Sequence, residues 1–273
     1  MLTGIYSNPE RDEKLATTEK LIGLLRRASV PFVLHSSLRG LIDGVSYFGD
    51  DCEPRPDVIV TLGGDGTILS AVAFAAEKGI PVLGINLGHI GFLSACGTDA
   101  LDECVVRLAK GDYSVRRLAM LETYAAGKRL LALNEIVIYK KNVGKTVTLT
   151  VKVGGGVLSS AKCDGCMVST PTGSTGYALS AGGPIVDPGV RCNLVVPINC
   201  HHLSSKPVIV DASQAVEITS DEETCIIADG RVEDGAHSVV VRRSDVEALL
   251  VDTGAENFYA RLREKLDGSV EEV

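Results

Sequence analysis

The stretch that most constrains this chain is residues 61–67, Thr-Leu-Gly-Gly-Asp-Gly-Thr, whose last five residues we call the GGDGT turn (63–67). The apolar run 57–60 before it is typical of a buried parallel strand, and residues 68–78 after it predict a helix closed by Gly79. Backbone without Cβ atoms lets an anion approach closely, and the first N–H groups of the helix point at it. The sequence therefore predicts a phosphate-binding turn between a strand and a helix.

Asp65 is an unexpected residue in a plain phosphate site, because its negative charge repels phosphate. A carboxylate at this position is better explained as a proton acceptor or as an indirect metal ligand. The alternative is a tight turn in which Asp65 only caps the helix, since short glycine motifs often match by chance.

Composition limits the classes of protein to which the chain can belong. Its 273 residues fit one large domain or two modest ones, and 45% hydrophobic residues are ample for a core. A net charge of −8 argues against a nucleic-acid partner. The sequence has no apolar run of transmembrane length and no signal-peptide pattern. We expect a soluble, cytoplasmic protein without a membrane or nucleic-acid partner.

The eight cysteines are scattered through the chain, unlike those of a small disulfide scaffold. Cys163 and Cys166, together with the run Cys200-His201-His202, are a conceivable zinc site, but a second ligand pair with zinc-finger spacing is missing. Reduced, buried thiols are the preferred interpretation, and we predict no metal ligands from the protein itself.

Residues 1–112 alternate between strands and helices, which predicts an α/β domain with a parallel sheet flanked by helices. Besides the run before the GGDGT turn, we expect strands at 2–6, 30–34 and 81–85. One helix is expected from Pro9, with Asn8 as its N-cap, to about residue 28, and another over 99–110 before Gly111. Residues 39–55 read as a loop.

Residues 113–252 are rich in short β-type runs, so we expect an all-β, sandwich-like second domain. The predicted strands are 121–125, 130–139, 147–153, 194–198, 208–210, 215–218, 224–228, 238–242 and 246–251. Residues 253–273 contain a last amphipathic helix, 257–266, which we expect to return to the first domain.

One stretch of the second domain, 164–184, breaks the strand pattern with dense hydroxyl residues and glycines. Such residues supply donors and acceptors with little bulk, which suits a polyol or a nucleotide, and Tyr177 could stack on a base. The alternative is a surface Gly/Ser loop. Asn134-Glu135 is either a pair of ribose-hydroxyl partners or a simple turn, and Lys145 and Lys162 are lone cations near these loops.

In these motifs the sequence closely resembles the NAD kinase family. The matches occur in the family's order and cover most of residues 57–231: 63–67, 84–86, 91–93, 134–135, 164–184, and 202–204 with Pro207. The GGDGT turn alone is shared with phosphofructokinases and diacylglycerol-type lipid kinases, whereas the block 164–184 is strongly specific.

The resemblance implies transfer of a phosphoryl group to the 2′-hydroxyl of the adenosine ribose of NAD, giving NADP. The donor would be ATP or polyphosphate with Mg²⁺ or another divalent cation, held by donor oxygens and water. We expect the acceptor in a cleft between the domains and the donor over the GGDGT turn. The family is typically homo-oligomeric, which implies a homodimer or a homotetramer.

The resemblance also implies roles for single residues. Asp65 would be the general base and would contact NAD together with Gly66, and Phe92 would form a wall of the pocket. Asn134 and Glu135 would hold ribose hydroxyls or adenine, and Asp164 the other ribose or the nicotinamide end. Softer matches by spacing make Lys145 and Lys162 basic NAD contacts. The adenine pocket would be shaped by Thr175, Gly176, Tyr177, Ala178, Leu179 and Ser180. The donor phosphates would lie against Gly63, Gly64, Gly66 and Thr67.

The sequence departs from the family pattern at a few positions. Gly176 replaces the usual alanine, His201 a proline and Arg231 a glutamine, and the pair Cys163 and Cys166 has no counterpart that we associate with the family. Two other functions are compatible with parts of the sequence. One is a kinase of another acceptor that shares the GGDGT turn, and the other is a non-catalytic dinucleotide-binding sensor.

Overall fold

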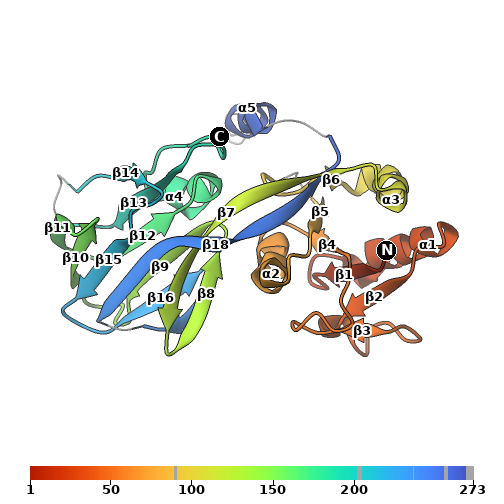
Figure 1. The fold of residues 1–273 in the computed structure, drawn as a ribbon, viewed down its shortest axis with the longest axis horizontal. Coiled ribbons are helices and arrows are strands. Elements are labelled where there is room, and N and C mark those ends of the chain that lie inside the picture. Colours follow the sequence, from red (N-terminus) through yellow and green to blue (C-terminus); the bar gives the residue numbers. More distant parts are fainter. Residues whose placement is uncertain (89–90, 202–204, 236, 255–257, 269–273) are drawn as a thin grey trace. The chain divides into compact units, whose positions relative to one another are not determined.

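The fold comes from a computed structural model of the chain that describes residues 1–88, 91–201, 205–235, 237–254 and 258–268. The chain divides into two compact units (Figure 1). Unit 1 comprises residues 1–117 and 248–273, and unit 2 comprises residues 118–247. Unit 2 begins a few residues after the predicted boundary at 113 and ends a few residues before the predicted boundary at 252. The chain passes between the units in two long strands, β7 (Ser114–Ala125) and β18 (Ser238–Asp252).

Unit 1 is an α/β unit with parallel strands. Its sheet has the order β3-β2-β1-β4-β5, with the last residues of β18 beside β5, and the pairs within it are parallel. The elements are β1 (Thr3–Ser7), α1 (Ala16–Arg27), β2 (Phe32–His35), β3 (Tyr47–Phe48), β4 (Val58–Gly63), α2 (Asp65–Ala75), β5 (Val82–Asn86), β6 (Cys96–Gly97), α3 (Leu101–Lys110) and α5 (Phe258–Gly268). Apolar residues of the strands and of α1 and α3 form one core, which confirms the predicted class.

Helix α1 begins seven residues later than predicted. Asn8 and Pro9 lie in a turn, and the backbone of Lys14 and Leu15 has positive φ, which interrupts a helix. The cap is Asp12 instead, because its buried carboxylate accepts hydrogen bonds from the N–H groups of Thr17 (2.9 Å) and Thr18 (2.8 Å). The prediction of a helix from Pro9 was therefore wrong, whereas Gly79 and Gly111 end helical segments in the left-handed conformation as expected.

Unit 2 is a β-sandwich. One antiparallel sheet has the order β14-β13-β12-β9-β16-β17, and a second contains β11-β10-β15-β18, with β7 beside β18 and β8 beside β7. Buried residues of both sheets share one apolar cluster, so the sheets pack face to face. The strands are β8 (Lys128–Ala132), β9 (Glu135–Lys140), β10 (Val147–Val153), β11 (Gly156–Cys163), β12 (Gly165–Ser169), β13 (Cys192–Ile198), β14 (Val208–Asp211), β15 (Val216–Ser220), β16 (Thr224–Ala228) and β17 (Arg231–Asp234). A short helix, α4 (Tyr177–Ser180), follows β12.

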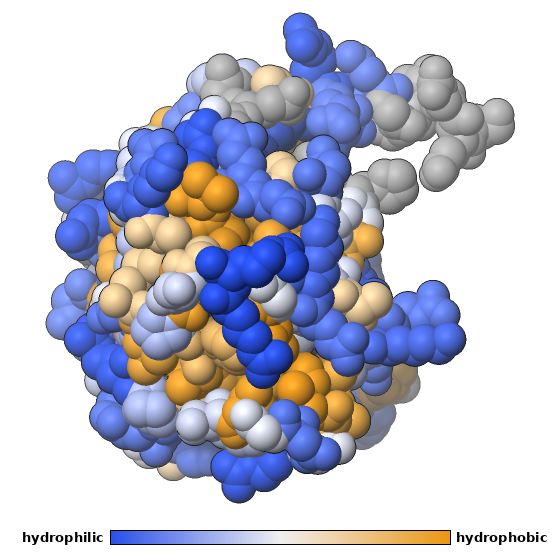
Figure 2. Space-filling view, turned by 90° about the vertical axis from the view of Figure 1, so that its right-hand side faces the viewer, coloured by the Kyte–Doolittle hydropathy of each residue, from blue (hydrophilic) through white to orange (hydrophobic). Residues whose placement is uncertain are grey.

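The surface carries apolar as well as polar residues. On the face drawn in Figure 2, apolar residues gather in a broad patch that hydrophilic residues surround and cross. Within the described ranges, the helices lack the length and the apolar composition that a membrane span requires.

Candidate active site

The GGDGT turn lies between β4 and α2, as the sequence predicts. Gly64 is the residue that caps α2, and Asp65 is its first residue. The Asp65 carboxylate accepts hydrogen bonds from two backbone N–H groups, those of Phe92 (2.9 Å) and Leu93 (3.3 Å). A Cβ atom at Gly91 would overlap this carboxylate, so only glycine fits there. Asp65 is thus held by the segment after β5, and the interpretation as a mere helix cap is wrong.

A cavity of about 340 Å³ opens beside this turn in unit 1. Its polar lining includes hydroxyl groups and one guanidinium group, that of Arg11. A Cβ atom at Gly64 would lie 2.7 Å from Arg11 Nη1, so the guanidinium sits directly against the glycine backbone. The lining residues are Tyr6, Ser7, Asn8, Pro9, Arg11, Ser37, Gly64, Gly66, Thr67 and Ser70. The sequence did not suggest Arg11, because Arg11 belongs to none of the recognised motifs and only the fold brings it to the GGDGT turn.

In unit 2, Asn134 lies in the turn from β8 to β9, and Glu135 is the first residue of β9. The carboxylate of Asp229 fixes this turn, because it accepts hydrogen bonds from the N–H groups of Leu133, Asn134 and Glu135 at 2.6 to 3.0 Å. Asn134 Oδ1 and Glu135 Oε2 are shielded from solvent and have no hydrogen-bond partner within the described parts of the chain. Buried polar atoms are rarely left unpaired, so these two acceptors indicate a place where a ligand supplies the donors.

Burial sets the charge of the carboxyl groups at this turn. It raises the pKa of Glu135 to about 8, and the neighbouring charge of Asp229 adds to the effect. Burial also raises the pKa of Asp229, although three backbone N–H groups oppose that shift. Sequence reasoning missed Asp229, which lies beside the turn because β9 pairs with β16.

Asp164, the other predicted carboxylate of unit 2, is held by two side chains that the sequence did not suggest. Lys140 Nζ lies 2.5 Å from its carboxylate, and Asn199 donates a hydrogen bond to it at 3.0 Å. The hydrogen bond from the Lys140 ammonium, with help from Asn199, lowers the pKa of Asp164. Asp164 is therefore a fixed anion, unlike Glu135.

The stretch after β12 forms a short 3₁₀ turn over 172–175 and then α4. A Cβ atom at Gly176 would lie 3.4 Å from Asn134 Nδ2 and 3.6 Å from Glu135 Oε2, so Gly176 borders the side chains of Asn134 and Glu135. The glycine that replaces the usual alanine leaves this space open. The side chains of Tyr177, Leu179 and Ser180 are exposed and that of Thr175 is partly buried, whereas Ala178 is fully buried in an apolar cluster with Met167 and Val196.

The remaining predicted residues lie elsewhere in the two units. Lys145 is exposed in the loop between β9 and β10, and Lys162 is exposed on β11. Phe92 belongs to unit 1, where its ring packs 6.0 Å from that of Phe258 in α5. The family match at 202–204 lies outside the described residues. The structure thus brings together Asn134, Glu135 and Gly176 in unit 2, and Asp65 with the other residues of the GGDGT turn in unit 1.

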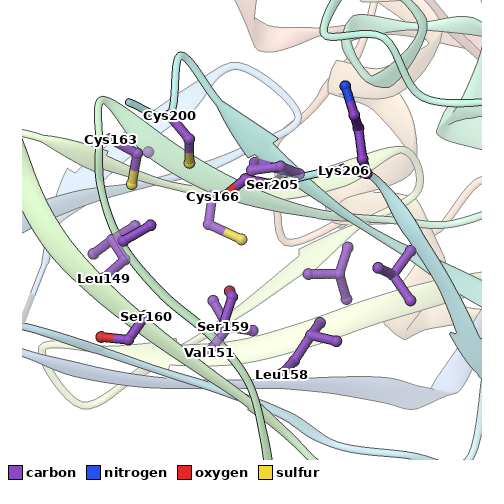
Figure 3. A pocket seen from close by; sticks show the side chains of 15 residues that line it. Leu149, Val151, Leu158, Ser159, Ser160, Cys163, Cys166, Cys200, Ser205 and Lys206 are labelled. Carbon is purple, nitrogen blue, oxygen red and sulfur yellow. The ribbon is translucent and has the colours of Figure 1, made fainter. Parts of the chain in front are cut away.

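A pocket of about 360 Å³ in unit 2 contains the thiols that were considered as zinc ligands (Figure 3). Cys163, Cys166 and Cys200 line it together with aliphatic side chains such as Leu149 and Val151. Burial raises the pKa of Cys166 to about 12 and also raises that of Cys163, which keeps both thiols protonated. Among the described residues, no three His, Cys, Asp or Glu side chains are placed to hold a metal ion.

Comparison with known proteins gives the chain a family. The sequence models of the ATP-NAD kinase N-terminal and C-terminal domains match residues 4–113 and 133–253. An NAD kinase from Methanopyrus kandleri is 38% identical over 270 residues, 97% of this chain and 96% of that protein. The crystal structure of an NAD kinase from Archaeoglobus fulgidus in complex with ATP has a TM-score of 0.81 at 26% identity and covers 98% and 99% of the two chains. Yeast NADH kinase complexed with NADH shares the fold, with a TM-score of 0.87 at 24% identity over 100% of this chain and 89% of that one.

Proposed function

The chain belongs to the NAD kinase family, and from that premise we propose that it phosphorylates the 2′-hydroxyl of the adenosine ribose of NAD to give NADP. The observation that supports NAD as the substrate that is phosphorylated is the pair of shielded, unpaired oxygens, Asn134 Oδ1 and Glu135 Oε2. Both are hydrogen-bond acceptors when Glu135 is ionised, so they match the hydroxyl groups of a ribose or the amino group of adenine. Gly176 and Tyr177 would border the adenine, and Asp164 would bind the other ribose.

Asp65 is the proposed general base. Its carboxylate accepts two backbone hydrogen bonds, which orient it without blocking all of its lone pairs. Such a carboxylate can accept the proton of the attacking hydroxyl while the phosphoryl group is transferred in line. Positioning and charge neutralisation, more than covalent chemistry, would provide the rate enhancement.

The donor would lie over the GGDGT turn, in the cavity that Arg11 and Thr67 help to line. Backbone N–H groups at the start of α2 and the Arg11 guanidinium would offset the charge of its phosphates. A hard cation such as Mg²⁺ would be held mainly by donor oxygens and water. The ion would neutralise the charge that develops on the transferred group. ATP and polyphosphate both fit this description of the donor.

The test is NADP formation from NAD, Mg²⁺ and either ATP or polyphosphate, with the new 2′-phosphate identified by ³¹P NMR. Asn134→Leu removes one of the two unpaired acceptors, so we expect the KM for NAD to rise about tenfold or more, and the exposed Asn142→Leu serves as the matched control. NAD binding without product from either donor would favour the sensor. Phosphorylation of a sugar or lipid but not of NAD would favour another kinase of the same fold.

A further inference from the structure

Helix α5 contributes a buried arginine to the segment that holds Asp65. Arg261 is only 8% exposed. Its Nη1 donates hydrogen bonds to three carbonyl oxygens of one short stretch: those of Ser94 (2.6 Å), Phe92 (3.2 Å) and Gly91 (3.4 Å). A cation that is buried against three carbonyl groups of a single turn fixes the conformation of that turn.

Arg261 and Asp65 bind opposite ends of the same two peptide groups. The carbonyl of Gly91 and the N–H of Phe92 belong to one peptide group, and the carbonyl of Phe92 and the N–H of Leu93 belong to the next. Arg261 binds the carbonyl end of both groups, and the Asp65 carboxylate binds the N–H end of both. Two consecutive peptide dipoles therefore run from a guanidinium to a carboxylate, and charges at the two ends strengthen both sets of hydrogen bonds.

Side-chain packing adds a second link between α5 and the same segment. The ring of Phe92 lies 6.0 Å from that of Phe258 and 5.8 Å from Lys265 Nζ. Within the segment, the Ser94 hydroxyl accepts a hydrogen bond from the Gly91 N–H (3.0 Å) and donates one to the Gly91 carbonyl (3.3 Å). The segment is thus closed on itself and held from the side of α5.

We propose that Arg261 is a positioning residue for phosphoryl transfer, which orients the Asp65 carboxylate through the peptide groups of residues 91–93. The inference rests on the proposed role of Asp65 as general base. A displaced base loses rate steeply, so removal of the guanidinium lowers kcat by about 10- to 100-fold. The KM for NAD changes little, because the oxygens proposed to bind NAD, Asn134 Oδ1 and Glu135 Oε2, belong to unit 2, whereas Arg261 belongs to unit 1.

A double-mutant cycle tests this coupling. kcat and the KM for NAD are measured for wild type, Arg261→Met, Asp65→Asn and the double variant, with Arg263→Met, an exposed arginine on the same helix, as the control. We expect Arg261→Met to lower kcat in the wild-type background but by less than about twofold in the Asp65→Asn background. Hydrogen exchange of the peptide that covers residues 91–94 should quicken in Arg261→Met and not in Arg263→Met.

Equal losses of kcat in both backgrounds, or exchange as slow as in Arg263→Met, would overturn the inference. The comparison of Asp65→Asn with wild type tests Asp65 separately. Unchanged turnover in that comparison would reject Asp65 as the base, and the inference about Arg261 with it. If Arg261→Met does not fold, Arg261→Lys carries the same cycle. Lysine keeps the positive charge but lacks the planar fork of donors, so a partial loss that again vanishes with Asp65→Asn supports the proposal.

Discussion

At the scale of single residues, carboxyl groups of this chain differ in charge because their surroundings differ. Asp164 is paired with Lys140, which favours the ionised form. Glu135 is buried beside Asp229, which favours the protonated form. A ligand that supplies hydroxyl donors to Glu135 would favour ionisation again, so its binding would be coupled to the charge of Glu135.

The raised pKa of Glu135 predicts how stability depends on pH. The group has its ordinary pKa of 4.5 in the unfolded chain and a pKa of about 8 in the folded one. Between these values the folded protein binds a proton that the unfolded chain has released, so stability falls as the pH rises through this window. Glutamine cannot titrate, so it does not lose stability in this way. In the absence of ligand, the thermal stability of Glu135→Gln minus that of wild type should therefore increase as the pH is raised from 5 to 8.5.

Differential scanning fluorimetry across this pH range provides the measurement. The exposed Glu222→Gln is the matched control for the exchange of a glutamate for a glutamine. A constant difference between Glu135→Gln and wild type would show that Glu135 has the same pKa in the folded and unfolded chains.

At the scale of elements, α1 depends on a cap that lies outside the helical pattern. The Asp12 carboxylate accepts hydrogen bonds from the N–H groups of Thr17 and Thr18 and from the Thr18 hydroxyl (2.6 Å). Asp12→Ala should lower the free energy of unfolding by about 1–2 kcal/mol, because it leaves buried donors unpaired at the helix start. Urea unfolding followed by circular dichroism measures this, with the exposed Asp43→Ala as control. Equal stability of the two variants would contradict the assignment of the cap.

Elements with a strong local pattern could be predicted from the sequence, and those that depend on partners could not. The strands 147–153 and 224–228 were predicted with their observed bounds, because their apolar residues alternate or cluster between clear turns. In contrast, most residues of β11 and β17 are exposed, so neither strand has a clear apolar pattern, and each pairs with a neighbour, β10 or β16. β12 was missed because its five buried residues begin the Gly/Ser-rich stretch.

Hydrogen bonds between residues far apart in the sequence also explain why one long strand replaces two predicted ones. Two strands were predicted over 238–242 and 246–251, but β18 is continuous. The buried Glu122 carboxylate accepts hydrogen bonds from Arg242 (2.7 Å) and Ser244 (3.1 Å), which satisfies the polar residues in the middle of β18. The candidate residues of each unit show the same limit. Their motifs could be predicted, whereas Arg11 and Arg261 in unit 1, and Lys140 and Asp229 in unit 2, come to those motifs only through the fold.

At the scale of the whole molecule, the family assignment predicts an oligomer. Each chain has a mass of 28.8 kDa, and we expect light scattering to give about two or four times this value, for a homodimer or a homotetramer. Apolar surface such as the patch in Figure 2 is available for contacts of this kind. A mass of one chain at working concentration would contradict this expectation.

The proposed role of Asp65 as acceptor of the hydroxyl proton is tested most directly by kcat for NADP formation by Asp65→Asn. Asparagine keeps the shape of the side chain but cannot accept the proton, so we predict a loss of at least about 100-fold. Calorimetry should show that NAD still binds within about threefold of the wild-type affinity, since the proposed NAD contacts in unit 2 are intact. Asp43→Asn is the control for the loss of one charge. Turnover equal to that of wild type would contradict the role of Asp65 as the base.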